Sequence, residues 1–396
     1  MGRRLALGTA VGIAGAAYGV FGILPERIAR SRNRVTRQPP YRATELAREL
    51  HRHLLVVDLH ADSLTWGRDL RVRASYGHVD VPRLIEGGIA LQALAVATKV
   101  PRRPSIEHND ARSDDVILLA IAQRWPRSTW RSLMARALYQ ADRARSMARG
   151  SDGRLSLIET AEDLDAYIAR RRADPGITAA LLTIEGAHAL EGDPAALDRL
   201  IDAGFRMMSL THFFDNEFGG SAHGIDRTGL TGPGRELVGR MEARSMLVDV
   251  AHASARTIDD ILTMATRPVV ASHTGVRATS DSVRNLSDDQ VRGIAATGGL
   301  IGIGFWPTAT GGDDVAAIGR AIGAAVGLAG VDHVALGSDF DGAVPLPFDA
   351  TGMVQLTDVL ISDGFTDAEI GAIMGGNALR LLTATLPRRE AEAAVC

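Results

Sequence analysis

The stretch LLVVDLHAD, residues 54–62, decides how this chain folds, because a short apolar run ends there on a histidine and a carboxylate. Five further apolar runs end in the same way, at residues 180–184, 207–211, 246–251, 268–272 and 334–338. The residues that follow them bind metals or exchange protons in many proteins: Glu185, His212, His252, His273 and Asp339. The runs are too short and too continuously apolar for amphipathic helices. They therefore predict strands that are buried on both faces of a parallel sheet.

Two more apolar runs, at residues 89–96 and 299–305, bring the number of predicted strands to eight. Helical patterns lie between the strands, over residues 194–203, 235–244, 255–265, 287–297 and 315–329. This alternation predicts an α/β fold, a (β/α)8 barrel of the TIM type, with catalytic groups at the carboxyl ends of the strands. An open doubly wound sheet is the alternative, but it would gather such groups at one switch point. An Arg-rich insertion from Lys99 to Ser156, between the second and third strands, is predicted to be helical, and its role is left open.

Composition narrows the kind of partner and the kind of metal site. The chain has 396 residues, of which 46% are hydrophobic and 23% charged, so one large barrel with insertions accounts for its length. A formal net charge of -3 gives no electrostatic case for nucleic acid, and a small-molecule substrate is expected instead. Cys396 is the single cysteine, which excludes an intrachain disulfide and a thiolate metal cluster. Metal ligands must come from histidines and carboxylates.

The N-terminal region, residues 1–40, is expected to lie outside the hydrolase barrel of residues 41–390. Leu5 to Leu24 is an uncharged apolar segment behind Arg3 and Arg4, long enough to span a bilayer, so we expect a membrane anchor followed by a basic linker. The small residues at 14–16 allow a cleaved signal peptide and export as the alternative. Arginines on both sides of the segment leave the side of the membrane open.

Five residues form a candidate pair of metal sites. His60 and Asp62 are two apart on an extended strand, so both side chains can face one ion. Glu185 places at the rim a carboxylate that can bridge two divalent ions. His252 and His273 end consecutive strands, which are neighbours in a barrel, so a second ion can take both imidazoles together with Glu185.

Other residues at the same rim are candidates for acid/base and binding roles. Asp339 is expected to act as general base beside a metal-bound water, whereas Asp341 fits a turn equally well. His212 can donate a hydrogen bond to an oxyanion, and Arg284 can form a fork with a substrate carboxylate. His223 lies in a loop-like context and is assigned no role.

This ordered set of motifs resembles the membrane dipeptidase family, also called renal dipeptidase-like or peptidase family M19, among the amidohydrolase-type barrels. The likeness runs from about Leu54 to Leu382. It implies two zinc ions per subunit, one held by the first three and the other by the last three of the metal ligands His60, Asp62, Glu185, His252 and His273. Members of the family tend to form dimers, so a homodimer is an expectation.

The resemblance also implies the activity, a zinc-dependent dipeptidase in which a hydroxide between the two ions attacks the peptide bond of a dipeptide. His212 matches the family's substrate-polarising histidine, Arg284 its carboxylate-binding arginine and Asp339 its proton-shuttling aspartate. The chain departs from the family after His212, where residues 213–220 replace the usual Asn-x-Pro-Trp stretch, and this leaves the substrate preference open. Alternatives are an N-acyl amino acid amidase or lactone hydrolase on the same dinuclear site, or a membrane-tethered binding protein without turnover.

Overall fold

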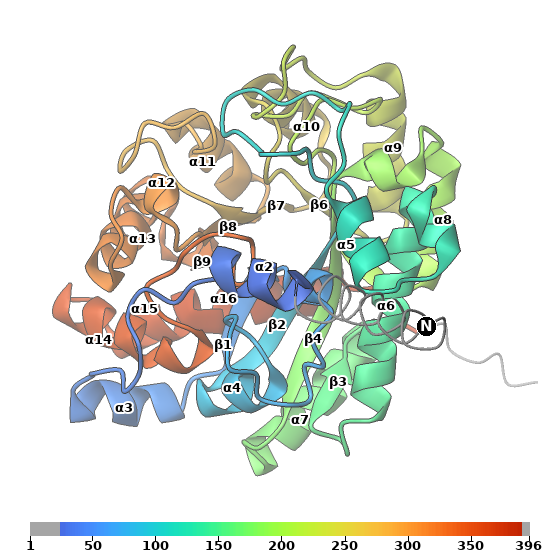
Figure 1. The fold of residues 1–396 in the computed structure, drawn as a ribbon. Coiled ribbons are helices and arrows are strands. Elements are labelled where there is room, and N and C mark those ends of the chain that lie inside the picture. Colours follow the sequence, from blue (N-terminus) through green and yellow to red (C-terminus); the bar gives the residue numbers. More distant parts are fainter. Residues whose placement is uncertain (1–23, 390–396) are drawn as a thin grey trace, which may run out of the picture.

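The computed structural model describes residues 24–389, in which eight parallel strands close into a barrel surrounded by helices (Figure 1). The barrel strands are β1 (Val56–Ala61), β2 (Ile89–Ala97), β4 (Thr178–Glu185), β5 (Phe205–Ser209), β6 (Leu247–Asp249), β7 (Val269–Thr274), β8 (Leu300–Ile303) and β9 (Val334–Leu336). Pairing of β2 with β4 closes the ring. The eight predicted strands and the barrel are therefore confirmed. Strand β3 (Leu155–Leu157), which pairs with the first residues of β4, was not predicted.

The helices follow the strands in the order expected for the fold. They are α2 (Leu24–Arg32), α3 (Glu45–Arg52), α4 (Val81–Glu86), α5 (Val116–Ala122), α6 (Leu133–Arg149), α7 (Ala161–Ala173), α8 (Leu197–Asp202), α9 (Gly232–Ala243), α10 (Ala255–Met264), α11 (Asp288–Ala296), α12 (Pro307–Thr310), α13 (Val315–Ala329), α14 (Val354–Ser362), α15 (Asp367–Gly371) and α16 (Asn377–Thr385). Many begin at a Ser, Thr or Asp whose side chain accepts a hydrogen bond from the first turn, such as Ser287 before α11. The five helical patterns predicted between strands all form helices.

The barrel interior is a packed core below the carboxyl ends of the strands. One buried apolar cluster takes side chains from all eight barrel strands, which only the inside of the ring allows. Its strand members are Val57, Leu59, Leu91, Ala93, Ala179, Leu181, Met207, Leu247, Val270, Leu300 and Ala335. Intervening strand residues such as Val56 and Leu182 pack in a second cluster with the helices. The continuous apolar runs seen in the sequence thus serve two buried faces.

The insertion after β2 is helical, as predicted, and contains α5 and α6. The buried Arg136 of α6 ties it together: its guanidinium donates to the carbonyls of Thr98 and Thr129 and pairs with Asp114 at 2.6 Å. The polar network explains how the insertion stays attached to β2.

Residues 24–37, expected to belong to a basic linker, contact the barrel. Helix α2 packs near α5, and it crosses in front of the barrel in the view of Figure 1. Further along, Val35 forms a parallel bridge with Leu346, and the side-chain oxygen of Asn33 accepts a hydrogen bond from the backbone of Ala343. The expected apolar anchor lies, except for Leu24, outside the described residues. Within residues 24–389, no helix is both long and apolar enough to cross a bilayer.

Candidate metal centre and substrate cavity

Three histidines converge on one carboxylate oxygen at the carboxyl ends of the strands, and Asp62 lies beside one of them. Glu185 Oε1 lies 3.4 Å from His60 Nε2, 3.2 Å from His252 Nε2 and 3.4 Å from His273 Nε2. Asp62 Oδ2 lies 3.6 Å from His60 Nε2. Ligands about 2.0–2.1 Å from a tetrahedral zinc are about 3.3–3.4 Å from each other. The spacing of the histidines around Glu185 therefore suits shared metal ions. Three groups of side chains lie close enough to hold a cation: His60, Glu185 and His273; Glu185, His212 and His252; and His60, Asp62 and Asp339.

Two strand irregularities turn histidines towards this centre. Between Asp58 and Ala61, three steps along β1 oppose two along β2, and the extra residue places His60 opposite Glu185. The same irregularity occurs in β7 around His273, between the pairs that β7 makes with β8. Such bulges re-aim side chains next to functional sites. The two imidazoles stack with their centroids 3.7 Å apart.

The hydrogen bonds of His252 determine which of its nitrogens faces the centre. The carbonyl of Ile106, in the insertion, lies 2.7 Å from His223 Nδ1 and can only accept, so this nitrogen carries a proton. His223 Nε2 is then the acceptor for His252 Nδ1, at 3.1 Å. His252 Nε2 is left with a lone pair, as a metal ligand requires. His223, which was assigned no role from the sequence, therefore supports a candidate metal ligand.

A second chain of hydrogen bonds acts in the same way on His273. Ser272 Oγ donates to Asp249 Oδ2 at 2.5 Å, so it accepts from His273 Nδ1 at 2.9 Å. His273 Nε2 therefore also carries a lone pair, and it lies 2.9 Å from His252 Nε2. Two buried lone pairs facing each other repel unless a cation lies between or beside them. Together with the unpartnered His60 Nε2, this arrangement fits a metal pair.

Burial shapes the protonation of the centre. It lowers the pKa of His252 and His273 well below the usual range, which keeps both imidazoles neutral. It also lowers the pKa of His60, but the charges of Glu185 and Asp62 more than offset this and raise that pKa to about 10. Burial, with the nearby charge of Asp62, raises the pKa of Glu185 well above its usual value. Bound cations would favour the ionised form of the carboxylates and displace the proton from His60.

Asp339 and His212 stand beside the ligands. Asp339 Oδ1 is 4.0 Å from His60 Nε2, and burial is the main cause that raises the pKa of Asp339 to about 8. Its backbone is left-handed, with φ of 62°, as is that of His252, with φ of 64°. Such conformations are rare for residues with a side chain and cluster at functional sites. His212 Nε2 lies 3.1 Å from Glu185 Oε2, and burial keeps the pKa of His212 well below its usual value.

Asp341 has a structural role, which was one of its two predicted readings. Its carboxylate is fully buried, pairs with Arg68 and accepts hydrogen bonds from Ser63 Oγ at 2.6 Å and from the backbone of His78 at 2.8 Å. Burial opposes ionisation, but Arg68, the side chain of His78 and the hydrogen bond from Ser63 hold the pKa of Asp341 well below its usual range. The acid therefore fastens the loop after β9 to the loop after β1.

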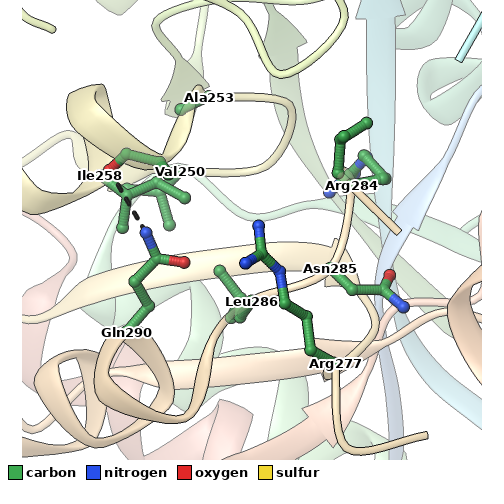
Figure 2. A pocket seen from close by; sticks show the side chains of 10 residues that line it. Val250, Ala253, Ile258, Arg277, Arg284, Asn285, Leu286 and Gln290 are labelled. Atoms are coloured by element: carbon green, nitrogen blue, oxygen red, sulfur yellow. Dashed lines mark hydrogen bonds between the residues drawn. The ribbon is translucent and has the colours of Figure 1, made fainter. Parts of the chain in front are cut away.

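Arg284 extends from the loop after β7 to the rim of the centre. Its Nη2 donates to the carbonyl of His273 at 2.6 Å, and its guanidinium lies over the ring of Trp306 at 5.6 Å. Burial is the main cause that lowers its pKa to about 10, so it stays charged at neutral pH. Figure 2 shows a small pocket beside this loop, around Arg277, Leu286 and Gln290. With about 10 Å³ it holds no more than one water and is no substrate site.

The metal centre opens into a much larger cavity of about 840 Å³. It contains the candidate catalytic and binding residues, including Asp62, Glu185, His212, Arg284 and Asp339. Helices α2 and α5 form part of its wall. A large concave space with a few convergent polar groups at its base is the usual form of a small-molecule site. Fold and site together define a barrel hydrolase that depends on metal ions.

Comparisons with known proteins agree with this class. A family model of membrane dipeptidases (peptidase family M19) matches residues 44–394. A protein of Klebsiella pneumoniae from the region 5' of pqqA, without known function, is 34% identical over 248 residues, 59% of this chain and 89% of that protein. An uncharacterised dipeptidase of Schizosaccharomyces pombe is 26% identical over 319 residues, 78% of this chain and 73% of that protein.

Solved structures show the same likeness. The crystal structure of a dipeptidase of family M19 superimposes with a TM-score of 0.69 at 26% identity, and the match covers 84% of this chain and 99% of the other. A metallopeptidase from Rhodobacter sphaeroides, liganded with a phosphinate mimic of the dipeptide L-Ala-D-Ala, gives a TM-score of 0.67 at 25% identity with the same coverage. The chain belongs to the membrane dipeptidase family, peptidase family M19, and is a metallopeptidase. The expected family is thereby confirmed.

Proposed function

We propose that this chain is a zinc-dependent dipeptidase with two metal ions in its site. The proposal is carried by His252 Nε2 and His273 Nε2, two nitrogens that each hold a lone pair and lie 2.9 Å apart beside Glu185. The Rhodobacter metallopeptidase, of the same fold, is liganded with a mimic of a dipeptide, which supports a substrate of this size.

The five ligands divide into two sets that share Glu185. His60, Asp62 and Glu185 would hold one ion, and Glu185, His252 and His273 the other. Histidine and carboxylate ligands without any thiolate suit zinc in a hydrolytic site. When bound, the ions would lower the pKa of a water molecule and polarise the carbonyl of the substrate.

The remaining residues move protons and position the substrate. Asp339, with its raised pKa, would accept a proton from the attacking water and deliver it to the nitrogen of the departing amine. His212 would donate its Nε2–H, which now faces Glu185, to the oxygen of the tetrahedral intermediate. Arg284 has donors left beside the one used on His273, and these would bind the C-terminal carboxylate of the substrate.

The test is a comparison of metal-free and zinc-restored protein on a panel of L,L and L,D dipeptides, with zinc content measured in parallel. We expect cleavage that disappears after chelation and returns when about two zinc ions per chain are bound. A protein that binds two zinc ions and cleaves no dipeptide of the panel would overturn the proposal.

We also propose that residues 5–24 anchor the chain to a membrane. The support is the composition of this run, which is apolar and uncharged over a length that spans a bilayer. Full-length chain should stay in the membrane pellet after extraction at high pH, and the mass of the extracted protein should include its first residues. Recovery of a shortened, extractable chain would favour a cleaved signal peptide instead.

A further inference from the structure

The cavity over the metal centre is larger than a dipeptide of small residues needs. Its volume of about 840 Å³ lies towards the upper end of the range of about 300–1,000 Å³ that ligand pockets have. Pockets of this size usually enclose ligands as large as drugs. The space beyond the metal centre therefore has room for a substantial part of a substrate.

The walls of that space are apolar and in contact with water. Eight large hydrophobic side chains of the described residues are exposed, and four of them line this cavity. Leu24 and Ile28 come from α2, Ile106 from the insertion loop and Leu118 from α5, with exposed fractions of 46%, 36%, 42% and 53%. Exposed apolar surface concentrated in one cavity marks a binding site for an apolar group.

The carboxylates of the cavity outside the metal centre are engaged elsewhere, and the cationic Arg32 of α2 also lines the cavity. Among the described residues that line it, the carboxylates outside the metal centre are Asp115 and Asp341. Asp115 lies 3.4 Å from Arg102 Nε, and Asp341 forms its buried pair with Arg68. Beyond the metal centre, the described residues therefore offer the cavity no unpaired acid to receive an ammonium group.

The topology shows which half of a substrate would reach the apolar walls. Arg284 follows β7 and α5 follows β2, and these two strands are four positions apart in the ring of eight, that is, on opposite sides. A substrate whose carboxylate is bound by Arg284 and whose amide lies at the metal centre therefore extends its acyl half towards α5 and α2.

We propose that the enzyme also hydrolyses N-acyl amino acids whose acyl group is a long aliphatic chain, and that α5 and α2 bind this chain. The inference rests on the proposed function, because it uses the same metal centre and the same role of Arg284. An N-acyl amino acid presents the same amide and the same carboxylate as a dipeptide. Water adds across the C–N bond: the acyl carbon becomes a carboxylic acid, and the amine nitrogen takes the proton through Asp339.

The experiment measures kcat/KM of the zinc-restored full chain on N-acyl alanines with acyl groups of increasing length, each below its micelle concentration, beside the dipeptide panel. We expect a two- to fourfold gain for each added methylene until the chamber is full, as for methylenes that leave water. Leu118→Gln should lower the ratio of long-chain to acetyl activity by about tenfold. Leu46→Gln is the matched control, since Leu46 is 64% exposed on α3 and does not line the cavity.

Each outcome decides between the two proposals. Dipeptide cleavage without any gain from acyl length, or a gain that Leu118→Gln leaves intact, would refute the acyl chamber and keep the dipeptidase. Zinc-loaded protein that cleaves neither class would refute both.

Discussion

Replacement of Arg284 should separate recognition of the substrate carboxylate from catalysis. Arg284 is 7% exposed, its guanidinium lies over the ring of Trp306 and uses one donor on the carbonyl of His273, and the residue lines the cavity with donors left for a substrate. In Arg284→Lys the charge stays, but the planar fork is lost. The variant should keep one charged contact with the carboxylate and lose another.

The size of the effect follows from the lost contact. A hydrogen bond to a charged group contributes about 1.5–3 kcal/mol, which corresponds to about 10- to 150-fold in kcat/KM. The assay crosses two enzymes, wild type and Arg284→Lys, with two substrates, a dipeptide that the wild type cleaves and its C-terminal amide. We expect the loss for the free acid and little change for the amide, since the amide lacks the group that Arg284 binds.

An equal loss on both substrates would contradict this expectation and would mean that Arg284 acts by supporting the candidate metal ligand His273. Zinc content, measured for each protein, shows whether the loss of the contact between Arg284 and His273 affects metal binding. Arg277→Lys is the matched control: Arg277 lies in the same loop and lines the small pocket of Figure 2, but unlike Arg284 it does not line the large cavity, so the kinetics of this variant should be those of wild type.

Four further outcomes are expected. Asp339→Asn should lower kcat by about 10²- to 10⁴-fold with unchanged zinc content, measured by steady-state kinetics and metal analysis, because general acid–base catalysis contributes about that much. His223→Phe should weaken zinc binding by about 10- to 100-fold in chelator competition, since it removes the hydrogen bond that orients His252. Zinc binding near pH 7 should release protons, seen by calorimetry in buffers of different ionisation enthalpy, because burial raises the pKa of Asp339 to about 8. Arg68→Met should destabilise the fold by about 3–5 kcal/mol in denaturant unfolding, because it leaves the buried Asp341 without its cation.

The stability of the metal-free protein should also depend on pH. A pKa of Asp339 raised above its unfolded value means that the metal-free fold holds an extra proton between about pH 4 and pH 8, so its stability should fall as pH rises through this range.

The control for Arg68→Met is Arg235→Met, which removes an ion pair with Asp260 at the surface and should cost no more than about 1 kcal/mol. Equal losses of stability in Arg68→Met and Arg235→Met would contradict the role of the buried pair between Arg68 and Asp341. Zinc affinity that is independent of pH would contradict the expected release of protons.

Much of the barrel could be predicted because its signals are local. Each strand is a short apolar run, and the length of a run and its continuity distinguish a doubly buried strand from a helix over a few residues. The direction of Glu185 follows from the same local pattern: alternate side chains of β4, at positions 179, 181 and 183, point towards the barrel axis, and Glu185 is the next in this series. The short strand β3 escaped prediction, because three residues carry no periodic pattern and pairing with β4 defines them.

The residue types at the carboxyl ends of the strands, and hence a metal centre made of histidines and carboxylates, were determined by the sequence alone. The tertiary structure brings His60 and His273 to that centre, because a bulge is a relation of register between two strands and neither strand encodes it alone. It also decided the tautomer of His252, through a hydrogen bond between His223 and the backbone of an insertion more than a hundred residues away. The shape of the substrate cavity also depends on tertiary structure, since α2 and α5 are far apart in the sequence and contact each other at its wall in the fold.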